Sequence, residues 1–250
     1  MISNEITSLT KAIAAGNTVF FGGAGVSTES GIPDFRSASG VYNKKTSSST
    51  TPEEMLSRAF FNKHTAEFYE FYTNNLIFPD AKPNLAHKAL ARMEKAGLLT
   101  AVITQNVDGL HQAAGSENVI ELHGSAHRNS CMKCGAKHPL SHVLAAKGRV
   151  PICRDCGGVV KPDVTLYGEM LGDAVTEAAI NAIERGKTLI IGGTSLAVYP
   201  AAMYVTYFEG STLCLINKSR TPYDSSADII IREGIGGVLA SVCEELGIGV

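Results

Sequence analysis

Apolar residues recur along the chain with two different spacings, and each spacing predicts one kind of element. Helical spacing predicts helices over residues 4–15, 84–96, 173–185 and 237–246. Asp173 is expected to cap the third of these helices. Short continuous apolar runs predict buried strands at residues 18–21, 100–104, 119–122, 188–192, 212–216 and 228–231. Because strands alternate with helices, we expect an α/β fold built on a parallel sheet.

Three stretches interrupt this alternation. Residues 22–40 are rich in glycine and predict a loop with one helical turn, and residues 43–54, "NKKTSSSTTPEE", predict a second loop that ends where Pro52 starts a helix. The cysteine-containing residues 131–156 predict an insert. Aromatic residues at helical spacing indicate a further helix with its aromatic face in the core, and these residues are Phe60, His64, Phe68, Phe71 and Tyr72.

Composition narrows the class of protein. The 250 residues suffice for one domain with or without an insert. A net charge of −2 and a pI of about 6.4 leave no strong basic field, so direct nucleic-acid binding is not expected. The first residues contain no long apolar run, so we expect neither a signal peptide nor a membrane span there. A reducing, cytoplasmic location is the expectation.

Four of the six cysteines form two Cys-x-x-Cys pairs with 18 residues between the pairs. This spacing is typical of a zinc ribbon, in which four thiolates close the coordination shell and the metal has a structural role. The predicted ligands are Cys131, Cys134, Cys153 and Cys156. Redox-active pairs or disulfides are the alternative, and His138 or His142 could replace one cysteine. Cys214 and Cys243 lie in apolar runs and are expected in the core.

Polar residues follow four of the predicted strands at their carboxyl ends, where ligands bind in parallel α/β sheets. They are residues 23–28, 104–109, 123–124 and 193–196. Each cluster alone has an ordinary explanation, such as a turn, a helix cap or a structural histidine. Together they would supply backbone N–H groups for a phosphate, amides and an acid for a polar ring, and an imidazole that takes up a proton near neutral pH.

The glycine turn after the first strand favours a nucleotide site but not hydride transfer. Gly23 and Gly25 match the first two glycines of the dinucleotide fingerprint, whereas Thr28 stands in place of the third. No acidic residue ends a second strand about 20 residues later, where a dehydrogenase holds the ribose. A dehydrogenase is therefore the least favoured nucleotide-dependent enzyme.

The motifs resemble those of the sirtuins, the NAD-dependent protein deacylases, and are most similar to bacterial members. In the family's order the chain contains "GAGVSTESGIPDFRS", "TQNVDGLH", "ELHG", both Cys-x-x-Cys pairs, "KPDVTLYGE", "GTSLAVYPA" and "LIN". Gly22 and Ala197 replace a common Thr and Val, and "LYGE" replaces the common "FFGE". None of these departures removes a chemical group that the family's reaction needs.

The resemblance implies a Rossmann-like large domain, a smaller inserted domain made of a four-cysteine zinc ribbon and helices, and NAD in the cleft between them. It places the large domain at approximately 1–36, 82–125 and 161–250. It places the small domain at approximately 37–81, which is helical and contains the cofactor loop "KKTSSSTT", and at 126–160, the zinc ribbon.

The resemblance also implies which residues bind NAD and substrate. The positions that contact NAD in the family correspond to Ala24, Thr28, Phe35, Arg36, Gln105, Asn106, Val107, Asp108, His123, Thr194, Ser195, Asn217 and Ile235. The edge that pairs with an extended acyl-lysine peptide corresponds to Val164, Tyr167, Gly168 and Glu169.

The implied reaction breaks the glycosidic bond to nicotinamide and moves no hydride. The acyl oxygen attacks the ribose carbon, Asn106 and Asp108 hold nicotinamide and the ribose, and His123 is the general base through the ribose hydroxyls. The products are lysine, nicotinamide and O-acyl-ADP-ribose. We expect acetyl-lysine as substrate, because Tyr42 is followed three residues later by Lys45 and not by the Arg of family members that prefer succinyl or malonyl groups.

Two other functions stay open at this point. Mono-ADP-ribosyl transfer breaks the same first bond but uses a different acceptor, and labelled NAD would then mark a target protein. A zinc-ribbon module that only holds a nucleotide would have no turnover for a His123→Ala substitution to change.

Overall fold

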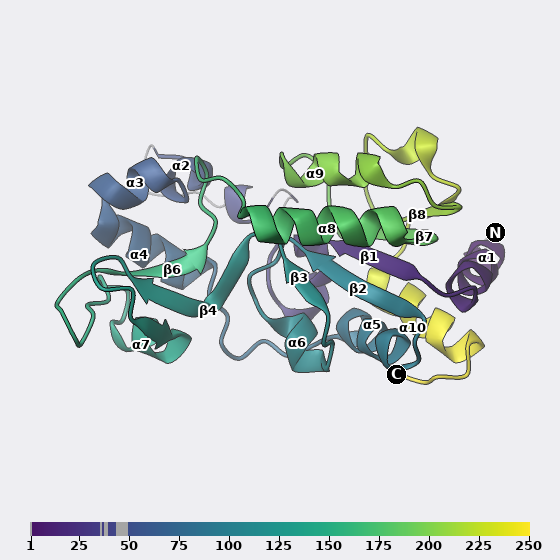
Figure 1. Cartoon of the computed structure of the whole chain (residues 1–250), viewed down its shortest axis with the longest axis horizontal. Helices are drawn as coiled ribbons and strands as arrows, with labels where there is room; N and C mark the ends of the chain where they lie inside the picture. Colours follow the sequence, from purple (N-terminus) through teal and green to yellow (C-terminus); the bar gives the residue numbers. More distant parts are fainter. Residues whose placement is uncertain (1, 36, 38–39, 44–49) are drawn as a thin grey trace.

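The computed structural model describes residues 2–35, 37, 40–43 and 50–250, and its larger lobe is built on a six-stranded sheet (Figure 1). The strand order is β3-β2-β1-β7-β8-β9, and all neighbouring strands are parallel, which confirms the predicted parallel sheet. The strands are β1 (Thr18–Gly22), β2 (Leu99–Thr104), β3 (Val119–Glu121), β7 (Thr188–Gly192), β8 (Thr212–Ile216) and β9 (Ile229–Ile231).

Side chains of the central strand alternate between two cores, one on each face of the parallel sheet. Phe20 packs with α1, α5 and α10, and these helices span Ile2–Ala14, Leu85–Lys95 and Ile235–Glu245. Val19 and Phe21 pack with α8 and α9, which span Asp173–Arg185 and Ala201–Tyr204. Both faces are covered, which explains why β1 and β7 are apolar at consecutive positions and fully buried. Cys214 and Cys243 lie in the core, as predicted.

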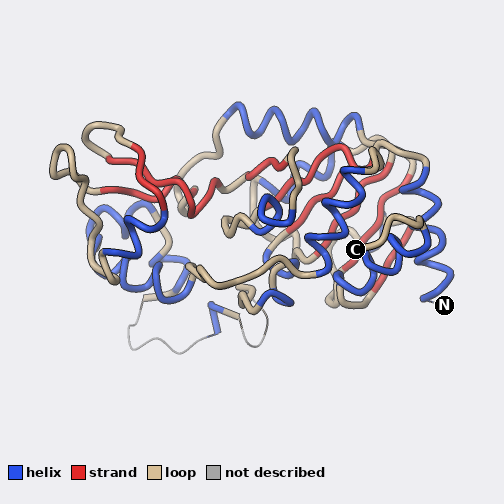
Figure 2. The backbone as a smooth tube through the Cα atoms, turned by 90° about the horizontal axis from the view of Figure 1, so that it is seen from below, coloured by secondary structure: helices blue, strands red, loops and turns tan. Residues whose placement is uncertain are grey.

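The smaller lobe contains an antiparallel sheet and a group of helices. Figure 2 shows its three strands apart from the parallel sheet, with order β5-β4-β6. The strands span Lys137–Pro139, Gly124–Cys131 and Val160–Val164, in that order. The helices are α2 (Pro52–Met55), α3 (Arg58–Lys63), α4 (Thr65–Asn75) and α7 (Leu140–Ala145), and α6 (Leu110–Ala114) lies beside α5 in the larger lobe.

Part of the predicted aromatic stripe lies in the core of the smaller lobe: Phe68, Phe71 and Tyr72 are buried there, whereas Phe60 is half-buried and His64 is exposed. Phe61, Phe68, Tyr69 and Tyr72 are among its fully buried side chains, and Phe68 meets Tyr69 edge-on with ring centroids 5.3 Å apart. The helix that carries them is not continuous, however. His64 ends α3 and precedes α4 with a φ of −131°, which is outside the helical range.

Two other predictions about local structure are wrong. Asp173 is the first residue of α8 and not its cap; Gly172 occupies the cap position and offers no side chain to the free N–H groups. The glycine-rich loop contains two three-residue 3-10 turns, Ala24–Val26 and Thr28–Ser30, where one helical turn was expected. Among the helices of the described residues, none combines the length and apolar character that crossing a bilayer requires.

The junction between the lobes depends on a glycine at the start of β4. Gly124 has a φ of +76°, and a Cβ atom on it would lie 2.0 Å from the backbone oxygen of Asp163 in β6. Gly16, after α1, has nearly the same φ, +77°, but nothing lies within 4 Å of its Cβ position. Substitution of Gly16 therefore introduces backbone strain alone, whereas substitution of Gly124 introduces backbone strain and steric overlap.

We expect Gly124→Ala to lower the free energy of unfolding by roughly 2–4 kcal/mol, because left-handed strain and overlap with Asp163 add. Gly16→Ala carries the strain alone and should lower it by about 1–2 kcal/mol. Urea unfolding of both variants measures the difference. Equal losses at the two sites would contradict the assigned overlap.

Candidate functional site

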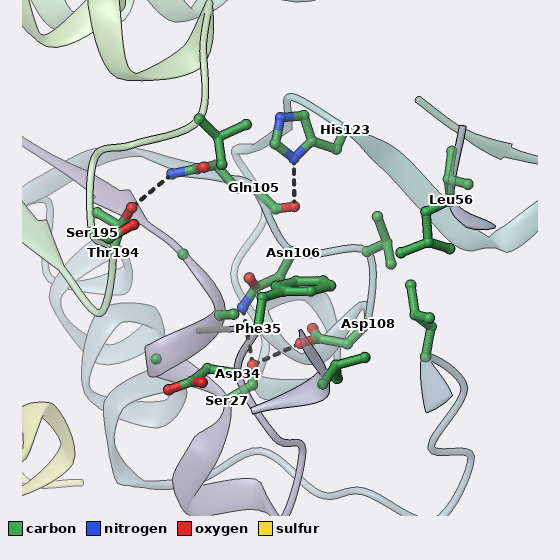
Figure 3. Close-up of a pocket in the computed structure, with 18 of the residues that line it drawn as sticks. Ser27, Asp34, Phe35, Leu56, Gln105, Asn106, Asp108, His123, Thr194 and Ser195 are labelled. Atoms are coloured by element: carbon green, nitrogen blue, oxygen red, sulfur yellow. Dashed lines mark hydrogen bonds between the residues drawn. The ribbon is translucent and has the colours of Figure 1, made fainter. Parts of the chain in front are cut away.

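A cleft of about 420 Å³ lies where the loops at the carboxyl ends of β1, β2, β3 and β7 meet the smaller lobe (Figure 3). The larger lobe contributes residues from three of the predicted polar clusters, 23–28, 104–109 and 193–196, and His123 from the cluster at 123–124. The smaller lobe contributes apolar side chains, including Leu56, Tyr72 and Val164. The parallel register of the strands is the reason that four segments far apart in the sequence meet at this one edge.

Two glycine turns approach each other at the base of the cleft. The Gly25 N–H donates to the Gly193 oxygen at 2.8 Å, and a Cβ atom on Gly25 would lie 2.8 Å from the Gly193 Cα. A Cβ atom on Gly23 would lie 2.8 Å from the Cβ of Thr194. The glycines of the broken fingerprint are thus required by the contact between the β1 and β7 turns, which leaves room for no side chain.

A hydrogen-bond network holds the Asn106 and Asp108 side chains. The Ser27 hydroxyl donates to Asp108 Oδ2 at 2.6 Å and accepts from Asn106 Nδ2 at 3.0 Å (Figure 3). Asp108 Oδ1 accepts from the Leu110 N–H at 2.9 Å, at the start of α6. Each carboxylate oxygen of Asp108 therefore accepts a hydrogen bond, which fixes the orientation of the carboxylate beside the amide of Asn106.

His123 follows β3 and is oriented by the turn after β2. Its Nδ1 lies 3.0 Å from the Gln105 backbone oxygen (Figure 3). Because a carbonyl oxygen can only accept, Nδ1 carries the proton and the neutral ring presents Nε2 as an acceptor. Burial lowers the pKa of His123 below its ordinary value of 6.5, and the hydrogen bond to Gln105 opposes part of that shift. The imidazole is therefore in the form that accepts a proton at neutral pH.

The side chain of Gln105 links two walls of the cleft. Its Nε2 donates to the Thr194 hydroxyl at 3.2 Å, so the turn after β2 is tied to the turn after β7. The same hydroxyl accepts from the Leu196 N–H at 3.2 Å. Thr194 is 9% exposed, which makes it a structural member of the wall as well as a lining residue.

The expected peptide edge lies at the mouth of the cleft between the lobes. Tyr167 forms a parallel bridge with Ser57, in which its N–H donates to the Leu56 oxygen and its oxygen accepts from the Arg58 N–H. Its backbone groups are thus already paired within the chain. Glu169 lies beside it and forms ion pairs with Arg58 at 2.9 Å and with Lys161 at 3.3 Å. These ion pairs hold the 167–169 segment against α3 and β6.

Most of the predicted site residues line this single cleft. They are Ala24, Phe35, Gln105, Asn106, Val107, Asp108, His123, Val164, Tyr167, Gly168, Glu169, Thr194, Ser195 and Asn217. Thr28 and Ile235 are not among the lining residues. Thr28 is exposed and its hydroxyl donates to the Gly25 oxygen at 2.9 Å, whereas Ile235 is 5% exposed in the core. Arg36 lies outside the described residues, as does Lys45 with residues 44–49 of the expected cofactor loop.

Several residues that line the cleft were not predicted as site residues from the sequence. Ser27 was not distinguished within the glycine turn, yet it joins Asn106 to Asp108. Its neighbour Thr28 also carries a hydroxyl, so no local signal identifies Ser27 as the residue that makes this link. Leu56, directly after α2, and Tyr72, in α4, line the cleft from the smaller lobe. Tyr72 was expected only as a core residue of the aromatic stripe, and Leu56 has the sequence environment of an ordinary core position, so nothing local marks either as a site residue.

The four predicted zinc ligands come together at the far end of the smaller lobe. Their Sγ atoms all lie within 4.8 Å of one another, with Cys131 and Cys156 at 3.4 Å and Cys134 and Cys153 at 3.7 Å. These distances exceed an S–S bond of about 2.05 Å, so the pairs are not disulfides. A Cβ atom on Gly158 would lie 2.9 Å from the Cys131 Sγ, so the chain folds tightly around the sulfurs. Four converging thiols fit a structural Zn²⁺.

Comparison with known proteins agrees with these motifs and this geometry. The model of the Sir2 family matches residues 23–200 of this chain. The NAD-dependent protein deacetylase of Clostridium acetobutylicum is 54% identical over 243 residues, which are 97% of this chain and 99% of that protein. That of Staphylococcus aureus strain N315 is 41% identical over 243 residues, 97% of this chain and 99% of that protein.

Solved Sir2 structures share the fold over nearly the whole length. One with a deacetylated p53 peptide and 3'-O-acetyl ADP ribose has a TM-score of 0.89 and 37% identity, and the match covers 98% of this chain and 99% of that chain. Another, with a p53 peptide and NAD+, has a TM-score of 0.85 and 38% identity and covers 97% of this chain and 98% of that chain. This chain therefore belongs to the Sir2 family, the sirtuins.

Proposed function

We propose that this chain is an NAD-dependent protein lysine deacetylase, which removes acetyl groups from acetyl-lysine and produces nicotinamide and O-acetyl-ADP-ribose. The observation that carries the proposal is one cleft that holds His123, with an acceptor nitrogen, together with the Ser27–Asn106–Asp108 network. Relatives named NAD-dependent protein deacetylase and a solved Sir2 structure bound to an acetylated peptide support it.

Three residues have catalytic roles in this proposal. Asp108, held by hydrogen bonds from the Ser27 hydroxyl and the Leu110 N–H, accepts hydrogen bonds from the nicotinamide amide. Asn106 binds the nicotinamide and the reactive ribose from beside it. His123 Nε2 takes a proton from a ribose hydroxyl, and the Gln105 carbonyl, which accepts from Nδ1, stabilises the imidazolium that forms.

NAD, when bound, supplies the ADP-ribose group that accepts the acetyl group as nicotinamide leaves. We propose that the turns after β1, β2, β7 and β8 hold it, with Phe35 beside the reactive carbon to exclude water. The proposed contact residues are Ala24, Thr28, Arg36, Gln105, Val107, Thr194, Ser195 and Asn217, with Ile235 at the adenosine end. The close approach of the Gly25 and Gly193 turns supports this assignment, because it leaves backbone and not side chains at the cleft base.

The protein partner in this proposal is an acetylated polypeptide bound as an extended strand. Val164, Tyr167, Gly168 and Glu169 form the edge that it pairs with. The Tyr167 backbone is already bonded, whereas the Gly168 N–H and oxygen have no hydrogen-bond partner among the described residues and are offered to the peptide. The acidic pI of about 6.4 gives no support for direct nucleic-acid binding.

Thiols clustered as metal ligands suit a reducing compartment, so we propose the cytoplasm as the location.

We also propose that the two lobes are domains with the boundaries given above. Separate buried clusters support this division. Residues of β1 and β7 belong to the two cores of the larger lobe, whereas α4 contributes to a third core. β6 pairs with β4 and contributes Val164 to this third core, although the boundary at residue 160 assigns most of that strand to the larger domain. The cleft then lies between two bodies, with lining residues from both.

The proposal predicts NAD-dependent loss of acetyl from an acetyl-lysine peptide, with formation of O-acetyl-ADP-ribose. His123→Ala should lower this rate by about 10²–10⁴-fold, the usual contribution of a general base. His64→Ala is the matched control, because His64 is exposed and paired with Glu67 outside the cleft. Mass spectrometry of the peptide and of the nucleotide products measures both.

Three other results would contradict the proposal. NAD consumption without deacetylation would replace the proposal by ADP-ribosyl transfer or by another acyl group, and faster desuccinylation of the same peptide would contradict acetyl as the substrate. If a panel of acyl peptides consumed no NAD, the chain would be a nucleotide-binding protein and not an enzyme.

The protonation state of His123 predicts the acid side of the pH profile. The base must be neutral, so kcat/KM falls as the pH drops through its pKa. Because burial lowers that pKa below 6.5, the midpoint of the acid limb should lie below pH 6.5. Measurement of kcat/KM for the peptide across pH checks this, with circular dichroism to confirm folding at each point. An acid limb centred above 6.5 would contradict it.

Loss of one cysteine ligand should abolish zinc binding. We expect Cys131→Ala to leave well below one zinc ion per chain and to unfold the smaller lobe, because zinc binding contributes directly to folding. Cys214→Ala is the control, since Cys214 is a buried core cysteine outside the cluster and its variant should keep the metal. Elemental analysis and thermal unfolding measure the two effects. A Cys131 variant with normal zinc content and stability would refute the structural role.

A further inference from the structure

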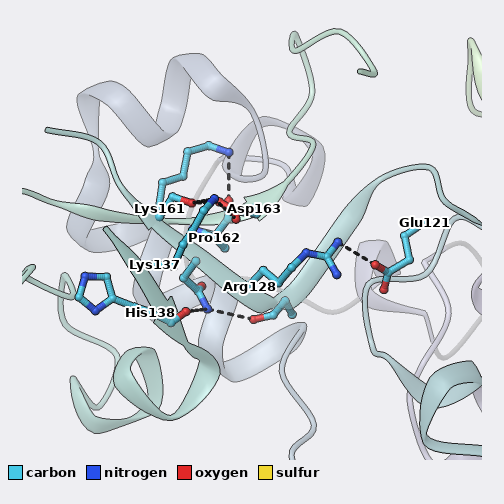
Figure 4. Close-up of polar contacts among 10 residues, drawn as sticks. Glu121, Arg128, Lys137, His138, Lys161, Pro162 and Asp163 are labelled. Atoms are coloured by element: carbon cyan, nitrogen blue, oxygen red, sulfur yellow. Dashed lines mark hydrogen bonds and ion pairs between the residues drawn. The ribbon is translucent and has the colours of Figure 1, made fainter. Parts of the chain in front are cut away.

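One histidine lies against the sulfur cluster. His138, in β5, has its Nε2 at 3.4 Å from the Cys153 Sγ. Its backbone is held in the small sheet, opposite Asn129 of β4, and the Asn129 amide donates to the His138 oxygen at 3.3 Å. Figure 4 shows the His138 ring turned away from Lys161 and Asp163, so this ring takes no part in their polar contacts. The ring is therefore placed by the sheet and directed at the sulfur.

The direction of the contact follows from the chemistry of the sulfur. A cysteine that binds zinc is a thiolate, and a thiolate can only accept a hydrogen bond. The proton of a neutral His138 must then reside on Nε2. This assigns one tautomer to His138 in the zinc-loaded protein.

A second histidine holds the first. His142, in α7, stacks on His138 with ring centroids 4.4 Å apart and planes inclined by 25°. Its Nε2 lies 3.0 Å from the Ile152 oxygen, and because a carbonyl only accepts, Nε2–H donates. Ile152 precedes Cys153 in the chain. The ring pair is thus attached at both ends to the segment that carries one zinc ligand.

The zinc site has a charge that such a donor offsets. Four thiolates around Zn²⁺ carry a net charge of −2, and N–H donors to the sulfurs stabilise that charge. The Lys133 N–H donates to the Cys131 Sγ at 3.4 Å from the backbone. In the part of the chain that the structure describes, His138 supplies the one side-chain N–H that reaches a sulfur of the cluster.

We propose that His138 is a positioning residue of the zinc site: it donates a hydrogen bond to the Cys153 thiolate, and His142 fixes its ring by stacking. The imidazole acts outside the coordination shell, which keeps four sulfur ligands. The proposal concerns metal retention by the smaller lobe and holds whether or not the chain deacetylates peptides.

Two substitutions by amide side chains test whether the hydrogen bond itself, and not only a polar side chain at position 138, is required. His138→Gln places an amide N–H near the position of Nε2, whereas His138→Asn is one methylene shorter and cannot reach the sulfur. We expect transfer of zinc from the full chain to a chelator to be about 10-fold faster for the Asn variant, the lower end of the effect of outer hydrogen bonds on metal affinity. The Gln variant should stay close to the wild-type rate.

Lys137→Met is the control variant, because Lys137 neighbours His138 but pairs with Ser130 and Asp163. It should release zinc at the wild-type rate. Equal release rates for the Asn variant and the wild type would overturn the proposal, and so would an equally fast release from the Asn, Gln and Met variants, which would indicate a general loosening of β5.

Replacement of zinc by Co²⁺ gives a readout that packing alone would not move. Loss of a hydrogen bond to a thiolate makes the sulfur a better electron donor, so its charge-transfer band should shift to longer wavelength in the Asn variant and not in the Gln variant. X-ray absorption of the wild-type zinc protein should give four sulfur ligands. A nitrogen ligand that disappears in the His138 variants would replace the proposal by direct coordination.

Discussion

The close contact between the turns after β1 and β7 is the constraint on which the rest of the site depends. The Gly25 N–H donates to the Gly193 oxygen at 2.8 Å, and neither residue leaves space for a Cβ atom. This contact sets the distance between the two central strands where they end. The Gln105–Thr194 hydrogen bond and the Ser27 network are built from the adjoining residues, so their geometry follows from it.

Backbone carbonyls determine how the histidines of this protein act. The Gln105 oxygen assigns the proton of His123 to Nδ1 and leaves Nε2 as the proton acceptor in the cleft. The Ile152 oxygen in the same way assigns the proton of His142 to Nε2. Because a carbonyl only accepts, the position of the carbonyl selects the tautomer, and the same side chain presents an acceptor nitrogen to the cleft in one lobe and is a structural donor in the other.

The sequence predicted elements well where a single local signal decides them. Strands β7 and β8 have the predicted bounds, since continuous apolar runs with polar ends mark buried parallel strands. It failed where the signal is not local. The break at His64 between α3 and α4 has no proline or glycine to mark it. Strand β4 has mixed polar residues and an irregular burial pattern, and it pairs with β6 across a register shift. Strand β6 does alternate, but it has only five residues and contains Pro162, so its pattern is too weak to identify a strand without its partner.

The sequence by itself determined the parallel α/β architecture, the four sulfur ligands and the family, because strand period, Cys-x-x-Cys spacing and motif order are properties of short segments. Only the tertiary structure decided which hydroxyl joins Asn106 to Asp108, which apolar side chains of the smaller lobe face the cleft, and that His138 lies against Cys153. The reason is physical: these contacts join residues from different elements, and their distances are set by how sheets and helices pack.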